Sequence, residues 1–256
     1  MVEESQPIIE LQNINKSYGS VKALRNVSFK AFAGEVIGLV GDNGAGKSSL
    51  IKVISGVHAQ DSGSLFVDGV ERHWKSPHDS MEAGIETLYQ DSGLAPDLTI
   101  GSNIFLGREK KRSGLLGHLG FLDQRWMERE ALVELEKVGI SVPASKRTVS
   151  QLSGGQRQAV AIGRAAMWAK HVIILDEPTN HLGARQSQEV LKVIAAARDQ
   201  GRCVLFISHT LPHVIEVSDR IIVLRLGKVV RDSPTSEYTV ESLLATITGL
   251  SEIANT

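Results

Sequence analysis

The chain has 256 residues, of which 42% are hydrophobic and 22% are charged, a composition typical of a globular protein with one large or two small packed units. Its 28 basic and 29 acidic residues leave a formal net charge of −1. Such a chain lacks the strong basic field that holds a phosphate backbone, so we expect no nucleic-acid partner, although the charge balance does not exclude a local basic patch.

The sequence carries no sign of export or membrane insertion. No apolar segment follows the acidic start, and no apolar run approaches the roughly 20 residues of a membrane-spanning helix. Cys203 lies in the apolar run 203–207, which favours a buried thiol over a reactive one. These features predict a cytosolic protein.

Residues 8–33 alternate loosely between apolar and polar side chains, which predicts two antiparallel strands joined by a turn at Gly19-Ser20. Tyr18 stands just before that turn. Two interpretations stay open for it: an exposed tyrosine at a strand end, or a flat apolar face offered to a nucleobase.

The apolar run 36–40 breaks into a glycine-rich turn that leads directly into a helix, and the segment 41–48 spells G-x-x-x-x-G-K-S. This spacing, in this strand–turn–helix context, predicts a P-loop that binds a nucleotide. Glycines let successive backbone N–H groups surround a polyphosphate, and the helix N-terminus adds its positive dipole end. The residues expected to contact the nucleotide are Gly41, Asn43, Gly44, Ala45, Gly46, Lys47, Ser48 and Ser49.

A helix is expected to end near Gly56, followed by a strand and turn over 64–69 and another strand over 84–89. The last strand delivers Gln90 at its carboxyl end, where α/β sheets place ligand groups. An amide at this position is suited to Mg²⁺ or to the attacking water.

Strand signals disappear from about residue 91 to 152, and helices are expected over 98–106 and 123–138. Between them the charged run 107–112 leads into a Gly- and Leu-rich stretch that ends at Phe121. We expect a solvated, mobile loop there, with a membrane or partner contact as the alternative. The whole segment predicts a helical insert in the α/β core.

A second glycine-rich helix start follows at 152–156, before a helix expected over 157–168. Ser153 is a suitable N-cap, and the adjacent glycines allow close backbone approach to an anion. The residues expected to contact a phosphate here are Ser153, Gly154, Gly155 and Gln156.

Polar residues end two further buried strands. Asp176 and Glu177 follow the run 172–175, and His209 follows the run 204–207. Behind a P-loop, Asp176 is expected to hold Mg²⁺ and Glu177 to orient and deprotonate water. A hairpin over 220–231 and a helix over 240–247 complete the chain.

This order of motifs resembles the ATP-binding subunit of ABC transporters, and the matches at Tyr18, 41–48, Gln90, 152–156, 173–177 and His209 cover nearly the whole chain. The resemblance implies an α/β fold: a P-loop NTPase core with an antiparallel β subdomain and an inserted α-helical subdomain. It implies a core lobe of about 1–90 and 157–256 and a helical lobe of about 91–156. It also implies a head-to-tail homodimer with two ATP molecules at the interface, where each P-loop faces the helix start at Ser153 of the partner chain.

A finer resemblance, to ATPases that import ribose, xylose and fructose, rests on the stretches 103–109, 177–183 and 246–249. Two features depart from the wider pattern. Most members of the sugar group fuse two ATPase halves, whereas this chain has one, so a homodimer is required. Where the family usually has aspartate this chain has Gly183, so a carboxylate expected to communicate across the dimer is missing.

The resemblance implies an ATPase that couples Mg-ATP hydrolysis to monosaccharide import. In it Lys47 stabilises the transferring phosphoryl, Glu177 acts as the base and His209 senses the γ-phosphate. Ser48, Gln90 and Asp176 are the expected Mg²⁺ ligands. The expected partners are transmembrane permease subunits and, indirectly, a solute-binding protein, with the chain peripheral on the inner face of the cytoplasmic membrane. The alternatives are a soluble ABC-type ATPase acting on nucleic acid or ribosomes, and a regulatory cassette that binds ATP without hydrolysis.

Overall fold

A computed structural model describes residues 6–142 and 147–250. The chain divides into two compact units. The first, here called the sheet unit, takes the described parts of Met1–Thr87, Ala169–Glu177 and Arg198–Thr256. The second, the helical unit, takes the described parts of Leu88–Trp168 and Pro178–Ala197. No helix among the described residues is long and apolar enough to cross a membrane.

One sheet of the sheet unit is antiparallel and has the order β2-β1-β4-β5. Its strands are β1 (Ile9–Tyr18), β2 (Val21–Ala31), β4 (Ser62–Val67) and β5 (Val70–Arg72). The pairing of β1 with β2 runs from Ile9 opposite Ala31 to Tyr18 opposite Val21, which confirms the predicted hairpin. Gly19 in its turn has a φ of 58°, a left-handed conformation that glycine adopts without strain.

The other sheet has the order β10-β9-β3-β8-β7-β6. Its strands are β3 (Val36–Val40), β6 (Ile85–Leu88), β7 (Val172–Asp176), β8 (Cys203–Ile207), β9 (Arg220–Arg225) and β10 (Lys228–Pro234). The strands β3, β7 and β8 are parallel and almost wholly buried, which explains their uninterrupted apolar runs. Their carboxyl ends therefore meet at one sheet edge, where the P-loop, Glu177 and His209 follow.

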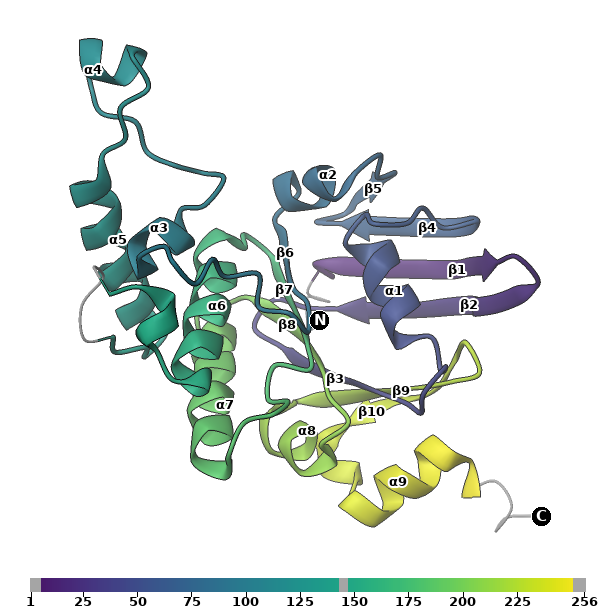
Figure 1. Ribbon diagram of the computed structural model, residues 1–256. Helices are drawn as coiled ribbons and strands as arrows, with labels where there is room; N and C mark the ends of the chain where they lie inside the picture. The colour runs from purple at the N-terminus through teal and green to yellow at the C-terminus, as the bar shows by residue number, and fades with distance from the viewer. Residues whose placement is uncertain (1–5, 143–146, 251–256) are drawn as a thin grey trace, which may run out of the picture. The chain divides into compact units, whose positions relative to one another are not determined.

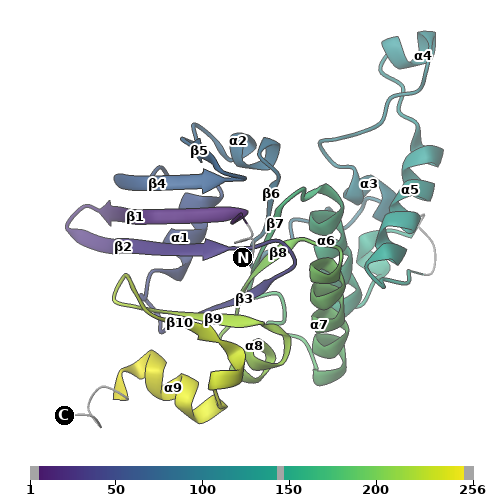
Figure 2. The same cartoon turned by 180° about the vertical axis from the view of Figure 1, so that it is seen from behind.

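The sheet unit also has helices, one of which, α1 (Lys47–Ile54), packs into the apolar core that both sheets share. The others are α2 (Pro77–Glu82), α8 (Leu211–Val217) and α9 (Val240–Thr248). The buried side chains of α1 belong to the same apolar cluster as residues of β1, β2, β3 and β8, and α8 and α9 pack near β9 in both views (Figures 1 and 2). Cys203 is buried, as expected, and burial raises the pKa of its thiol.

The helical unit packs around an aromatic cluster. Its helices are α3 (Ile100–Ile104), α4 (Leu115–His118), α5 (Gln124–Lys137), α6 (Gly154–Trp168) and most of α7 (Ala184–Asp199), with a 3₁₀ turn over Val149–Gln151. The Phe105 ring contacts the rings of Trp126 and Trp168 edge-on, at centroid distances of 5.4 and 5.5 Å. These contacts tie together the segments that hold α3, α5 and α6.

Three expectations for this part of the chain need correction. The helix expected from residue 157 begins at Gly154, because Ser153 caps it. The helix expected over 98–106 is limited to Ile100–Ile104, capped by the Thr99 side chain. The expected loop of residues 107–121 contains α4 and backbone hydrogen bonds of its own. Residues 157–168 and 178–197 belong to the helical unit. The expected lobe boundaries near 91 and 156 stay a prediction.

Candidate nucleotide-binding site

The P-loop is packed onto strand β2. A Cβ added at Gly46 would lie 2.7 Å from the carbonyl oxygen of Ala23, and its φ of 109° also requires glycine. The N–H of Gly227 donates to the Ala45 oxygen at 3.0 Å, and the N–H of Arg25 donates to the Gly227 oxygen at 2.7 Å. These contacts with β2 and Gly227 hold the loop in place. Helix α1 begins at Lys47, and the N–H groups of its first turn have no carbonyl partner within the helix.

The Lys47 ammonium is bound by its own loop. Its Nζ donates to the carbonyl oxygens of Gly41 at 2.6 Å and Asp42 at 3.2 Å. Burial lowers the pKa of Lys47, and the carboxylates of Glu177, Asp42 and Asp176 oppose that shift. An arriving phosphate must therefore replace carbonyl partners that already stabilise the cation.

Glu177 lies in a strained backbone conformation at the end of β7. Its φ is 53°, which is unfavourable for a residue with a side chain, and its N–H donates to the Ile207 oxygen at 2.9 Å. This turn brings its carboxylate to the end of β8, where His209 Nδ1 lies 2.8 Å from Glu177 Oε2. The Glu177 side chain is 15% exposed and that of His209 is 64% exposed. The pairing orients a largely covered carboxylate beside the P-loop.

Asp176, the last residue of β7, is electrostatically crowded. Burial raises the pKa of its carboxyl group, the neighbouring Glu177 carboxylate raises it further, and Lys47 lowers it. A cation binding between the carboxylates and a phosphate would relieve this crowding. Asp176 is therefore a source of pH-dependent stability.

In buffer without nucleotide or Mg²⁺, Asp176→Asn is expected to raise the melting temperature at neutral pH. A raised pKa means that stability from this group is complete at low pH and is lost as the pH rises through that pKa. The gain should reach the low end of the roughly 0.5–2 kcal/mol that stabilising substitutions yield, because solvent screens the part-exposed carboxylate. Thermal melts over a pH series, with the exposed Asp97→Asn as control, measure it. A lower melting temperature for Asp176→Asn at neutral pH would contradict the expectation.

The donor atoms at this sheet edge fit Mg²⁺. The Ser48 hydroxyl and the Asp176 carboxylate are hard oxygen ligands, and Mg²⁺ commonly uses one or two carboxylates together with substrate phosphates. Among the residues that the structure describes, no group of three or more His, Cys, Asp or Glu side chains is placed to hold a metal unaided. The residues therefore suit a Mg²⁺ ion held jointly with a nucleotide.

A cavity of about 500 Å³ within the sheet unit is lined by Lys47, Glu177 and His209 together. Residues of the P-loop, β7 and β8 ends give it a polar wall, and α8 and α9 give it an apolar one. Its lining includes Gly41, Asp42, Asn43, Lys47, Glu177, Ser208, His209, Leu211, Leu244 and Ile247. The sequence analysis missed the part played by α9, where Leu244 is an exposed apolar residue beside the buried Leu243.

Tyr18 is exposed at the end of β1 and is braced by the segment that follows α1. The ring of His58 meets the Tyr18 ring edge-on at 5.5 Å. Asp61 accepts hydrogen bonds from Lys16 Nζ at 2.9 Å and from the Ser17 N–H at 2.7 Å. The tyrosine therefore has a fixed position on the same unit as the P-loop.

The other predicted residues belong to the helical unit. Gln90 follows β6, and Ser153 caps α6: the Gln156 N–H donates to Ser153 Oγ at 3.3 Å and the Ser153 N–H donates to Gln156 Oε1 at 3.0 Å. A Cβ at Gly155 would lie 2.8 Å from the Cβ of Gln186 in α7, whereas at Gly154 the nearest atom, of Leu182, is 3.7 Å away. Packing therefore requires glycine at 155 but leaves room at 154.

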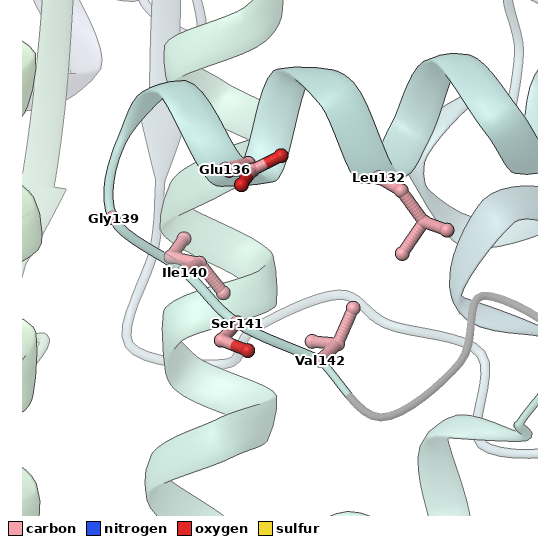
Figure 3. A pocket seen from close by; sticks show the side chains of 6 residues that line it. All are labelled: Leu132, Glu136, Gly139, Ile140, Ser141 and Val142. Atoms are coloured by element: carbon pink, nitrogen blue, oxygen red, sulfur yellow. The ribbon is translucent and has the colours of Figure 1, made fainter.

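The helical unit also has a surface depression of about 360 Å³ at the end of α5 (Figure 3). The side chains of Leu132 and Val142 point into the same space, and among the described residues of the lining Glu136 is the one that is ionisable. The described part of this lining offers a phosphate neither a cation nor a helix N-terminus, whereas the P-loop offers both.

Comparison with known proteins agrees with this geometry. The family model described as "ABC transporter" matches residues 24–180. The chain is 41% identical to the fructose import ATP-binding protein FrcA of Rhizobium meliloti, with 96% of each covered, and 42% identical to the xylose/arabinose import ATP-binding protein XylG of Sulfolobus acidocaldarius, with 94% of each covered. It also resembles the solved ADP conformation of an ATP-binding cassette of an ABC transporter, at 26% identity and a TM-score of 0.77, covering 95% of this chain and 96% of that one.

Proposed function

The chain belongs to the ABC transporter family of ATPases, and from this membership we propose that it energises the import of a monosaccharide by hydrolysing Mg-ATP. The observation that carries the proposed chemistry is the single cavity in which Lys47 of the P-loop faces the Glu177–His209 pair. The sugar assignment rests on the fructose and xylose/arabinose importers that this chain resembles over almost its whole length.

In this proposal the polyphosphate of ATP displaces the Gly41 and Asp42 carbonyls from the Lys47 ammonium. Lys47 and the P-loop N–H groups then stabilise the charge that develops on the transferring phosphoryl group. The Glu177 carboxylate accepts a proton from the attacking water. His209 holds Glu177 Oε2 in position, a role that adds orientation of the base to the γ-phosphate sensing expected from the sequence.

Ser48 and Asp176 are the residues of the sheet unit that would hold Mg²⁺, and the ion would supply positive charge to the phosphate oxygens. We propose that Gln90, carried by the helical unit, completes this set. The carboxylate of Asp176 then gains a partner for the charge that burial and Glu177 disfavour.

We further propose that the chain works as a head-to-tail homodimer on the inner face of the membrane, bound to permease subunits that receive sugar from a solute-binding protein. Two glycine-rich helix starts support the dimer. The P-loop has one phosphate cradle, and Ser153 to Gln156 supply a second, which suits the nucleotide of the partner chain. Gly183 lacks the carboxylate usual in the family, so this route of communication across the dimer is missing.

Purification of the tagged chain from detergent-solubilised native membranes tests this function. We expect a polytopic permease to co-purify and the complex to show ATPase activity that a monosaccharide, presented by its solute-binding protein, stimulates. Co-purification with ribosomes or nucleic acid would favour the soluble ATPase instead. ATP binding without any turnover in the assembled complex would favour a regulatory cassette.

We propose that the exposed ring of Tyr18 stacks on adenine, so Tyr18→Ala is expected to weaken ATP binding by roughly 0.5–1.5 kcal/mol. Tyr18→Phe and Tyr18→Trp should be nearly silent. Isothermal titration with ATP measures the effect, and titration with inorganic triphosphate, which has no base, is the control that should not change. Equal losses for alanine and tryptophan would argue against stacking.

A further inference from the structure

The segment 107–122 forms a folded arm of the helical unit, with α4 near its end (Figures 1 and 2). Its two sides are joined by backbone hydrogen bonds: the Arg112 N–H donates to the Phe121 oxygen at 2.9 Å and the Asp123 N–H donates to the Lys110 oxygen at 2.7 Å. A Cβ at Gly117 would collide with the Arg112 oxygen, so glycine allows α4 to pack on the hairpin. The arm is therefore an ordered hairpin with α4 packed on it.

Aromatic side chains fix the base of this arm. The guanidinium carbon of Arg108 lies 4.8 Å from the ring centroid of Trp168, and Lys110 Nζ lies 5.7 Å from that of Trp126. Both tryptophans contact Phe105 in the interior of the helical unit. The tip is therefore presented at a fixed place on its unit.

Apolar side chains cover the tip and remain exposed. Leu115 is 77% exposed, Leu119 66% and Phe121 55%, and Leu116 and Leu122 are also exposed. Large apolar side chains that are exposed together on a surface mark an interaction site, whereas single scattered ones do not. A loop that served only as a solvated connection would not need them.

Cations accompany the apolar tip. Between Gly107 and Leu122 the chain has four basic residues, Arg108, Lys110, Lys111 and Arg112, against one acidic residue, Glu109, although the whole chain has a net charge of −1. Lys111 and Arg112 are exposed. Apolar residues at a tip with lysine and arginine behind it match the two layers of an anionic membrane surface, acyl chains below charged headgroups.

We propose that the arm of residues 107–122 binds the surface of an anionic lipid bilayer, with Leu115, Leu119 and Phe121 inserted at the headgroup boundary and Lys111 and Arg112 on the lipid phosphates. This goes beyond the proposed function, on which it rests only for placing the chain beside a membrane. The contact is made with lipid and requires neither permease nor nucleotide.

Flotation of the purified chain with lipid vesicles tests the proposal. We expect binding to vesicles of phosphatidylcholine mixed with phosphatidylglycerol, little binding to phosphatidylcholine alone, and release when the salt concentration rises from about 0.05 M to about 0.5 M. Leu115→Ser with Leu119→Ser should lower the partition coefficient at least about tenfold. The matched control is Val133→Ser on α5, an exposed apolar residue outside the arm, which should bind like wild type.

A second variant keeps the apolar tip and reverses its charge. Lys111→Glu with Arg112→Glu should also abolish binding to anionic vesicles. In a separate variant, Leu119→Trp, brominated lipid in the anionic vesicles should quench the fluorescence of the introduced indole. Every variant should keep the wild-type ATPase activity and circular dichroism, because the arm is outside the nucleotide-binding cavity lining. Absence of binding to anionic vesicles at low salt, equal binding by the charge-reversed variant, or binding only to vesicles that hold a permease would overturn the proposal.

Failure here is distinct from failure of the proposed function. A chain that imports sugar through its permease without binding lipid vesicles refutes the arm alone. A chain that binds vesicles but supports no sugar-stimulated ATPase activity refutes the function alone.

Discussion

Glu177→Gln is expected to lower ATP turnover by about 10²–10⁴-fold and to leave ATP affinity unchanged. The amide retains nearly the shape of the carboxylate but cannot accept the proton of the attacking water. The structure adds a reason to expect a well-formed variant: an amide oxygen can still accept the hydrogen bond that the His209 backbone N–H donates to Glu177 Oε2. The binding cavity should therefore be preserved while the chemical step fails.

Steady-state and single-turnover ATPase assays, with equilibrium binding of ATP alongside, measure this effect. Glu189→Gln is a suitable control because it makes the same chemical change on an exposed side chain of α7, where Glu189 pairs with Arg185. That variant should turn over ATP like wild type. Turnover close to wild type in Glu177→Gln would remove Glu177 from the mechanism.

Gly155→Asp is expected to abolish ATP-driven dimerisation and hydrolysis while the monomer still binds ATP. In the proposed dimer the helix start at Ser153 faces the γ-phosphate of the partner's nucleotide, and a carboxylate there would oppose a phosphate in a desolvated interface. The structure complicates this variant, because a side chain at position 155 also meets Gln186. A matched pair at position 154 separates charge from packing.

At Gly154 an added Cβ makes ordinary contact, so Gly154→Ala should be tolerated and Gly154→Asp should fail like Gly155→Asp. Mixing Lys47→Ala with Gly154→Asp gives mixed dimers in which one composite site is intact and the other is doubly broken. Partial recovery of ATPase activity on mixing supports assembly across the dimer. Full activity in a Gly154→Asp protein held monomeric would exclude it.

Local sequence patterns were sufficient to predict the buried parallel strands and the β1–β2 hairpin. The apolar runs of β3, β7 and β8 are long enough and pure enough to mark buried parallel strands, and the residues that follow them lie at one sheet edge because parallel strands share a direction. The sequence therefore predicts that Lys47, Glu177 and His209 lie near one another, and all three line one cavity. The β1–β2 hairpin was equally accessible, since alternation and a glycine turn are local features.

Tertiary contacts produced what the sequence analysis missed. Nothing in the residues around Glu177 reveals its positive φ, which depends on the hydrogen bond from its N–H to Ile207 in another strand. The pairing with His209 follows from that conformation. Likewise, α9 lines the cavity because it packs near β9, and the arm at 107–122 owes its shape to a hairpin closed by non-local hydrogen bonds.

Because the P-loop packs on β2, its position relative to the β1–β2 hairpin is fixed within the sheet unit. Tyr18 pairs with Val21 of β2, and Gly46 lies against Ala23 of the same strand, so β2 sets the distance between Tyr18 and the P-loop. We propose that Tyr18 contacts the base and the P-loop the phosphates, so that a ligand is selected by its length as well as by its chemistry. In this proposal a free base or a free phosphate makes one of the two contacts, whereas an intact nucleotide makes both.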